Sequence, residues 1–144
     1  DEMYFETPDK EPGTSELFPR IQEPASISLS LIVPAYNEEL RLHNMMDEMI
    51  AYLRERRVPT WEIIVVDDGS SDRTADVVLK YTRRCGSDRV RLLQLRRNCG
   101  KGGAVRKGML RARGEYLLMV DADGATDAAE LRKLMKELTS IERD

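Results

Sequence analysis

With 144 residues and a formal net charge of −3 at pH 7, the chain has room for one domain and no overall charge excess that would attract nucleic acid. Hydrophobic residues make up 41% of it, enough for a core, but the apolar runs stay far below the roughly 20 residues of a membrane-spanning helix. No signal peptide is visible, and Cys85 and Cys99 lack metal- or redox-type spacing, so we expect free thiols in a reducing compartment.

The first 27 residues differ in composition from the rest of the chain. They contain seven acidic and two basic residues, a net charge of −5, and four of the six prolines. This composition indicates a linker or a loosely attached arm rather than core structure. We therefore predict an acidic, proline-containing tail over residues 1–27 and a folded domain over residues 28–144.

From residue 28 onward, short apolar runs alternate with segments of helical periodicity. In chain order, the predicted strands are Ser28–Pro34, Trp61–Asp67, Val90–Leu95 and Glu115–Asp121. The predicted helices are Glu38–Arg57, Asp72–Cys85, Lys101–Arg113 and Asp127–Ile141. We expect Ser71 or Asp72 to cap the second helix and Gly114 to stop the third.

Strands that are apolar on both faces and alternate with helices indicate an α/β fold, a Rossmann-like parallel sheet with helices on both faces. In open sheets of this kind, ligands bind beyond the carboxyl ends of the strands. The unusual polar segments all follow predicted strands: they are Pro34–Glu39, Asp67–Ser70, Asn98–Gly103 and Asp121–Asp123. The sequence therefore predicts that four loops meet at one edge of the sheet.

Asp121 and Asp123 follow the apolar run Tyr116–Val120 at the end of the last predicted strand. Residues i and i+2 of an extended segment point to the same side, so the two carboxylates are expected to converge at the end of a buried strand. They would repel each other unless a cation neutralised them, and Mg²⁺ and Mn²⁺ prefer oxygen ligands. We predict a metal site here, shared with a phosphate or diphosphate.

The other loops suggest a nucleotide. Asp67 and Asp68 end a strand and can accept hydrogen bonds from a base or a ribose, with Gly69 allowing the tight turn that follows; simple helix capping is the alternative. Tyr36 can stack on a base or simply pack half-buried. The glycine-rich loop at Lys101 enters a helix and can bind an anion, although it matches neither a P-loop nor a dinucleotide fingerprint and a plain turn is the alternative.

Nine basic residues and no acidic one lie between Arg89 and Gly114. Most are expected on a solvated helix face, while some could attract a diphosphate or an anionic membrane surface. Because this stretch contains no aromatic residue on which bases could stack, we do not expect nucleic acid as a partner.

Taken together and in this order, the motifs Val33–Glu39, Val65–Ser70, Gly100–Gly103 and Asp121–Asp123 resemble those of family 2 glycosyltransferases with the GT-A fold. The resemblance runs from about Ser28 to the end of the chain. Within that family, Asn98–Arg106, Asp121–Thr126 and Met45–Glu48 are more similar to dolichyl-phosphate β-glucosyltransferases than to the mannose synthases. Ala125 and the Gly-Lys-Gly sequence are the places where the mannose synthases usually differ.

The resemblance implies an inverting transfer of glucose from UDP-glucose to dolichyl phosphate, giving dolichyl β-D-glucosyl phosphate for protein N-glycosylation. It implies a location at the endoplasmic reticulum membrane with the active site facing the cytosol. The residues implied in nucleotide-sugar binding are Pro34, Tyr36, Glu38, Asp67, Asp68, Gly69, Lys101 and Asp121. Lys101 would face the diphosphate, and Asp121 and Asp123 would be the catalytic pair that holds Mg²⁺ or Mn²⁺.

Several alternatives stay open. A mannosyl-type polyprenyl-phosphate glycosyltransferase and a nucleotidyltransferase would both use a metal and a diphosphate. A haloacid-dehalogenase phosphatase also uses Asp-x-Asp followed by Gly-Thr, but here Ala125 separates Gly124 from Thr126. The resemblance also places the acceptor-binding elements and the acidic base beyond the residues present. We therefore expect the donor-binding half, incomplete at its C-terminal end, and a non-catalytic UDP-sugar-binding fragment is a further alternative. The oligomeric state is open.

Overall fold

The computed structural model describes residues 4–6, 15–17, 25–123, 132–133 and 136–137. Its centre is a four-stranded sheet with the order β5-β4-β3-β6. The strands are β3 (Ile27–Ala35), β4 (Trp61–Asp67), β5 (Val90–Gln94) and β6 (Gly114–Met119). All neighbouring pairs are parallel. The parallel α/β fold predicted from the sequence is confirmed.

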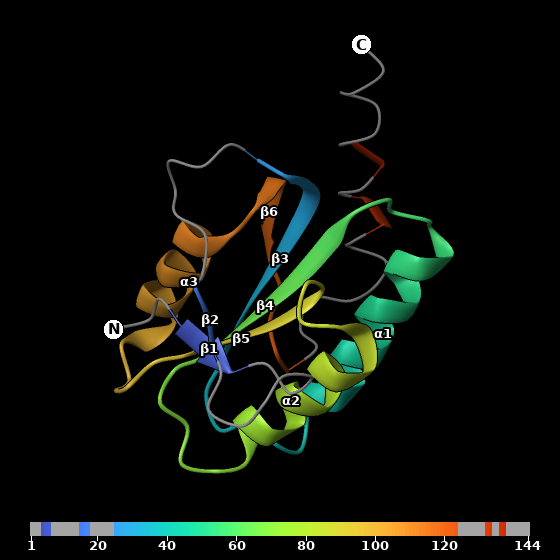
Figure 1. Cartoon of the computed structure of the whole chain (residues 1–144). Coiled ribbons are helices and arrows are strands. Elements are labelled where there is room, and N and C mark those ends of the chain that lie inside the picture. The colour runs from blue at the N-terminus through green and yellow to red at the C-terminus, as the bar shows by residue number, and fades with distance from the viewer. Residues whose placement is uncertain (1–3, 7–14, 18–24, 124–131, 134–135, 138–144) are drawn as a thin grey trace.

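Helices cover both faces of this sheet, as predicted (Figure 1). The helices are α1 (Leu42–Glu55), α2 (Thr74–Cys85) and α3 (Gly100–Arg111). The larger core lies between α1, α2 and one sheet face, where Met45, Met46 and Met49 are buried, so these methionines serve packing. A smaller core lies under α3 around Ile32 and Val66 on the opposite face.

The first helix begins four residues later than predicted. The carbonyl of Glu38 accepts the N–H groups of Arg41 and Leu42, so residues 38–41 form a turn before α1 starts at Leu42. The second helix also starts late, at Thr74, and its N-cap position is Arg73 rather than Ser71 or Asp72. Both corrections have one cause, because the residues before these helices hydrogen-bond across the loops, as described below.

The sequence predicted that Gly114 stops the third helix, and this prediction is wrong. The helix α3 ends at Arg111, and Gly114 is the first residue of β6. A Cβ atom at Gly114 would lie 2.5 Å from Ser30 Oγ and 2.6 Å from Ser30 N. This glycine therefore permits a close approach of β6 to β3. Gly108 does the same for α3, because a Cβ there would lie 2.6 Å from Ile32 Cγ2.

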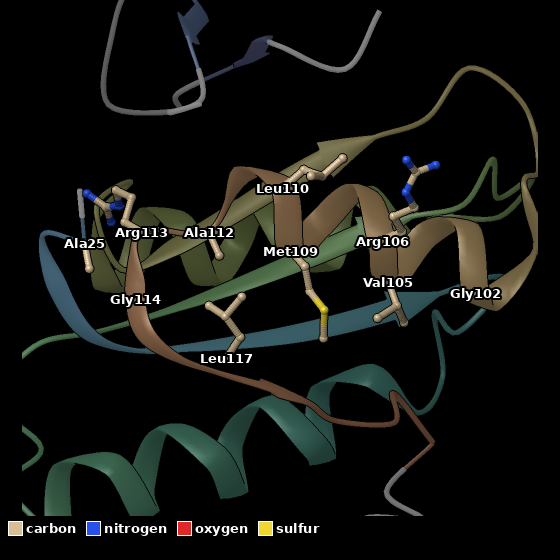
Figure 2. A pocket seen from close by; sticks show the side chains of 10 residues that line it. All are labelled: Ala25, Gly102, Val105, Arg106, Met109, Leu110, Ala112, Arg113, Gly114 and Leu117. Carbon is tan, nitrogen blue, oxygen red and sulfur yellow. The ribbon is translucent and has the colours of Figure 1, made fainter. Parts of the chain in front are cut away.

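The strand β6 is not buried on both faces, in contrast to the prediction. It lies at the edge of the sheet, and its residues alternate between half-buried and exposed. Leu117 and Met119 are 36% and 40% exposed, on the face that α3 covers only in part. A hollow of about 480 Å³ lies there, with Leu117, Met109 and Val105 around it (Figure 2).

Two short strands lie in the segment that the sequence indicated as a tail. They are β1 (Tyr4–Glu6) and β2 (Ser15–Leu17), which pair antiparallel, and β1 lies beside β5. Sequence patterning did not predict them. The last predicted helix, Asp127–Ile141, falls largely outside the described residues, although residues 132–133 and 136–137 are helical. Cys85 and Cys99 are free thiols.

Candidate functional site

The predicted site loops meet in one pocket, which we call the loop pocket, at the carboxyl ends of β3 and β6. Its volume is about 300 Å³. The residues that line it are Pro34, Ala35, Tyr36, Glu38, Asp68, Asn98, Gly100, Lys101, Asp121, Ala122 and Asp123. The strand β3 has β4 as its neighbour on one side and β6 on the other. The chain passes from β3 through α1 to β4, and later returns to the opposite side of β3 as β6. The pocket therefore lies at the switch point where open α/β sheets bind ligands.

Asp67 and Gly69 are the two predicted site residues that do not line the loop pocket. Asp67 is 2% exposed, and its Oδ1 atom accepts the N–H of Ser70 at 3.0 Å. Gly69 has a φ of +76°, and a Cβ atom there would lie 2.9 Å from Asn98 N. Both residues thus shape the turn after β4, and Gly69 lets the glycine-rich loop approach it closely.

Asp68 joins two of the loops that form the pocket. It is 3% exposed, and its Oδ1 atom accepts the N–H of Cys99 at 2.6 Å. Its carbonyl oxygen accepts a hydrogen bond from Asn98 Nδ2 at 3.3 Å, and its own N–H donates to the carbonyl of Ala35. Asp68 therefore both lines the pocket and fixes the entry to α3.

Tyr36 and Glu38 present different surfaces to the pocket. Tyr36 is 49% exposed, which favours an open aromatic face over half-buried packing. The Glu38 side chain is only 13% exposed, and Arg41 holds both of its carboxylate oxygens at 2.7 Å. Arg41 is a residue that sequence reasoning missed. Because the guanidinium of Arg41 balances its charge, Glu38 presents an ion-paired carboxylate rather than an unpaired negative charge.

A set of hydrogen bonds that we call the loop clamp fixes the loop after β3 to the loop after β4. Asn37 has a φ of +53°, and its Oδ1 atom accepts the N–H groups of Ser71 at 2.9 Å and Asp72 at 3.4 Å. The N–H of Asn37 donates to Ser70 Oγ at 2.9 Å. One residue further, the N–H of Glu38 donates to Thr74 Oγ1 at 2.9 Å. The clamp flanks Tyr36 directly, and its residue types, Asn, Ser, Asp and Thr, were the only signal of it in the sequence.

Asp72 completes the clamp from one position before the N-cap of α2. Its Oδ1 atom accepts the N–H of Thr74 at 2.9 Å and the Thr74 hydroxyl, while Oδ2 accepts the N–H of Glu39 at 3.2 Å. Partial burial opposes ionisation of this carboxyl, but the hydrogen bonds from Thr74 and Glu39 outweigh it, so the pKa of Asp72 lies below its ordinary value.

The glycine-rich loop ends at the first turn of α3, where the first N–H groups of a helix lack intrahelical partners. Asp68 accepts the N–H of Cys99, and Asn98 Oδ1 accepts that of Gly100 at 3.0 Å. The next N–H groups of this turn belong to Lys101 and Gly102. Backbone donors at a helix N-terminus, with a lysine beside them, are suited to a phosphate group.

Lys101 contacts the acidic side of the pocket directly. Its Nζ atom lies 2.5 Å from Asp121 Oδ1. The hydrogen bond and negative charge of Asp121, with a smaller contribution from Asp123, raise the pKa of Lys101 above its ordinary value. Two loops that are 20 residues apart in sequence are thereby joined across the pocket.

Asp121 and Asp123 both line the loop pocket, but strand alternation does not bring them there. The strand β6 ends at Met119, so the two aspartates lie in the turn that follows it. Among the residues that the structure describes, no three His, Cys, Asp or Glu side chains group as a metal site. Two carboxylates suit Mg²⁺ or Mn²⁺ when a bound phosphate supplies further oxygen ligands, so the residues fit a shared metal.

Within the described part of the chain, no helix has both the length and the apolar character needed to cross a bilayer.

Comparisons with known proteins place this pocket in context. A family model described as glycosyl transferase family 2 matches residues 30–144. The chain is 50% identical over 134 residues to a dolichyl-phosphate beta-glucosyltransferase of Mus musculus, a match that covers 90% of this chain and 41% of the mouse protein. The chain thus spans about two fifths of the length of the curated relatives that it matches.

Solved structures share the fold. S. aureus TarS 1-349 in complex with UDP has a TM-score of 0.55 and 33% identity, over 67% of this chain and 28% of that one. The mannosyltransferase PcManGT from Pyrobaculum calidifontis, in complex with GDP-Man and Mn²⁺, has a TM-score of 0.59 and 26% identity, over 73% of this chain and 29% of that one.

Proposed function

Because this chain belongs to glycosyl transferase family 2, we propose that it serves the transfer of glucose from UDP-glucose to dolichyl phosphate, with release of UDP. The observation that carries the proposal is the loop pocket, in which an exposed tyrosine, a lysine at a helix N-terminus and two aspartates line one hollow. The mouse dolichyl-phosphate beta-glucosyltransferase, at 50% identity, supports glucose as the sugar.

In this proposal the uridine lies against the loops after β3 and β4. The exposed ring of Tyr36 offers a stacking surface for the base, and Pro34 lines the same pocket. Asp68 and the neutralised Glu38 supply polar atoms for the base or the ribose. The loop clamp keeps these side chains in place before the nucleotide arrives, which lowers the entropic cost of binding.

The diphosphate lies at the first turn of α3. The N–H groups of Lys101 and Gly102 and the Lys101 ammonium stabilise its negative charge. Asp121 and Asp123 would hold a divalent cation, Mg²⁺ or Mn²⁺, and that ion supplies Lewis-acid stabilisation of the leaving group. The complex of PcManGT with GDP-Man and Mn²⁺ supports such an arrangement.

In the proposed reaction a phosphate oxygen of the acceptor attacks the anomeric carbon of glucose from the side opposite the diphosphate. A new bond forms between that carbon and the acceptor oxygen, the bond to the UDP oxygen breaks, and the configuration is inverted. The acceptor is a phosphate monoester with a second pKa of about 6, so it is already largely anionic at neutral pH. Stabilising the UDP leaving group is therefore the main task of the loop pocket.

A dolichyl chain is confined to a membrane, so the proposed acceptor places the reaction at a bilayer surface. We place it at the cytosolic face of the endoplasmic reticulum, where the product would serve protein N-glycosylation. The basic stretch between Arg89 and Gly114 suits an anionic membrane surface.

A second candidate function is UDP-sugar binding without transfer. It is favoured by the loop pocket itself, which offers a place for a UDP-sugar. The described residues provide a donor pocket, whereas transfer also requires a surface that holds the acceptor. A mannosyl-type enzyme is a third candidate, and it would prefer GDP-mannose.

One experiment in two arms tests the proposal. The first arm measures binding of UDP-glucose, UDP-GlcNAc and GDP-mannose to the chain by calorimetry with Mn²⁺ present, and we expect UDP-glucose to bind most tightly. The second arm replaces the aligned part of the mouse relative with this chain and assays glucose transfer to dolichyl phosphate. Transfer of glucose by the chimera supports the enzyme, binding without transfer favours the binder, and preference for GDP-mannose contradicts the donor assignment.

A further inference from the structure

We propose that Lys101 is an exchangeable counter-ion: it neutralises Asp121 while no divalent cation is present and moves to the diphosphate when the metal and the nucleotide bind. The idea rests on the proposed function, because it names the regulation of the same donor site. It goes further in assigning two successive partners to one side chain.

The first observation is the ion pair itself. Lys101 Nζ lies 2.5 Å from Asp121 Oδ1, and both residues line the loop pocket. Lys101 thus places a positive charge on one of the two carboxylates that fit a metal. In chemical terms, the ammonium stands in for the cation.

The second observation is the unequal exposure of the two partners. The Asp121 side chain is 25% exposed, whereas that of Lys101 is 60% exposed. The carboxylate is therefore held by its surroundings, while the lysine extends over the pocket on a flexible four-carbon stem. Rotation of its side chain can move the ammonium without any change in the backbone of α3.

The third observation is where Lys101 starts. It belongs to the first turn of α3, whose N–H groups suit a phosphate. A divalent cation on Asp121 and Asp123 would repel the ammonium at this distance, since both charges are positive. A diphosphate held by the same turn would attract it. Arrival of metal and nucleotide together therefore gives Lys101 a new partner as it loses the old one.

This exchange has a consequence that a simple phosphate-binding lysine would not have. Removal of Lys101 should change two affinities in opposite directions. Binding of Mn²⁺ alone should become tighter, because the competitor for Asp121 is gone. Binding of UDP to the Mn²⁺-loaded protein should become weaker, because the diphosphate loses a positive neighbour. We expect each change to be about two- to fivefold, as for an exposed ion pair.

The test titrates the full chain and its Lys101→Gln variant with Mn²⁺ in the absence of nucleotide. The electron paramagnetic resonance signal of free Mn²⁺ measures how much of the ion is bound. Binding of UDP at saturating Mn²⁺ is then measured by calorimetry. Arg106→Gln is the matched control, because it removes one positive charge from an exposed position of the same helix outside the loop pocket. Lys101→Arg retains the charge and should behave closer to the original chain in both titrations.

The expected result is tighter Mn²⁺ binding and weaker UDP binding in Lys101→Gln, with neither shift in Arg106→Gln. Unchanged or weaker Mn²⁺ binding in Lys101→Gln, equal shifts in both variants, or no measurable Mn²⁺ binding in any of the proteins would overturn the exchange. Neither readout requires sugar transfer. An active chimera without the opposite shifts refutes only the exchange, whereas opposite shifts with no transfer refute only the proposed reaction.

Discussion

Charged side chains are paired differently at the two ends of the central sheet. At the amino end, Glu62 is 0% exposed and its carboxylate accepts hydrogen bonds from Ser30 Oγ at 2.6 Å, Arg113 N at 2.7 Å and Arg113 Nε at 3.0 Å. At the carboxyl end, Asp121 pairs with a lysine that is 60% exposed. We call the group Glu62, Ser30 and Arg113 the amino-end cluster.

This difference suggests a structural role for the charges of the amino-end cluster and a ligand-binding role for the Lys101–Asp121 pair. The protein itself satisfies the amino-end cluster, which joins β3, β4 and the connection from α3 to β6. Burial of a charge is tolerated only when its partners are in place, so this cluster should contribute to stability and specificity of the fold. At the carboxyl end the ion pair lies in a pocket, and we propose that Lys101 exchanges partners there when a ligand binds.

The largest expected effect is on the amino-end cluster. Glu62→Ala removes the acceptor for Arg113 and Ser30, and breaking a buried ion pair typically costs about 3–5 kcal/mol. We expect a loss of about 3 kcal/mol in the free energy of unfolding, measured by urea denaturation. The exposed Glu55 at the end of α1 is the control, since Glu55→Ala should change stability by less than about 0.5 kcal/mol. Equal losses in the two variants would contradict a structural role for the amino-end cluster.

The second prediction compares a glycine from each end. A Cβ atom at Gly114 would lie 2.6 Å from a backbone nitrogen, whereas one at Gly102 would meet nothing within 4 Å. Gly114→Ala should therefore lower the free energy of unfolding by about 1–3 kcal/mol through overpacking. Gly102→Ala should leave stability unchanged or raise it by up to about 1 kcal/mol, because alanine favours helix. Thermal denaturation of both variants checks this, and a more stable Gly114→Ala protein would contradict the close approach.

The third prediction concerns the loop clamp at the carboxyl end. Asn37→Gly keeps the positive φ available but removes the acceptor for the Ser71 and Asp72 N–H groups. We expect UDP to bind about three- to tenfold more weakly, since Tyr36 and Glu38 lose their positioning, with a loss of about 1 kcal/mol in stability. Calorimetry and urea denaturation measure the two quantities.

A charged replacement is the informative control for the clamp. Asn37→Asp keeps an acceptor oxygen at this position, so this variant should bind UDP nearly as tightly as the original chain. If Asn37→Gly loses stability while its UDP affinity stays the same, the clamp is structural and does not position the nucleotide loop.

The smallest predicted effect is a pH dependence of the same clamp. The pKa of Asp72 is lower in the folded protein than its ordinary value of 3.8. The corresponding stabilisation is therefore present above the unfolded pKa and is lost as the pH falls through the folded one. Solvent screening limits it to about 0.5 kcal/mol. The free energy of unfolding, measured by urea denaturation between pH 5 and pH 3, should fall less steeply with decreasing pH in Asp72→Asn than in the original chain. Identical pH dependences would exclude this contribution.

Much of the fold was predictable because apolar periodicity reports burial. The span of β4 was predicted without error, and the apolar residues of α1 that recur at helical spacing between Leu42 and Leu53 are buried. The edge position of β6 was not predictable, because Tyr116–Val120 is equally apolar whether one neighbouring strand or two are present. Gly114 could not be assigned either, since a helix stop and a close strand contact both require glycine.

The candidate site was predictable as a set of loops but not as a set of contacts. The rule that ligands bind at the carboxyl ends of parallel strands was enough to bring Tyr36, Lys101 and Asp123 together. Two features depend on contacts between loops far apart in sequence: the hydrogen bonds of Asn37 with the loop after β4 and the Lys101 pair with Asp121. No local pattern reports such contacts.

The central claim is that the carboxyl end of the sheet holds a nucleotide diphosphate through a metal shared with Asp121 and Asp123. The most direct test measures the Kd of UDP with and without Mn²⁺ for the original chain and for Asp123→Ala. We predict that Mn²⁺ strengthens UDP binding at least about tenfold in the original chain and has little effect in the variant. The same dependence on Mn²⁺ in both proteins would contradict the claim.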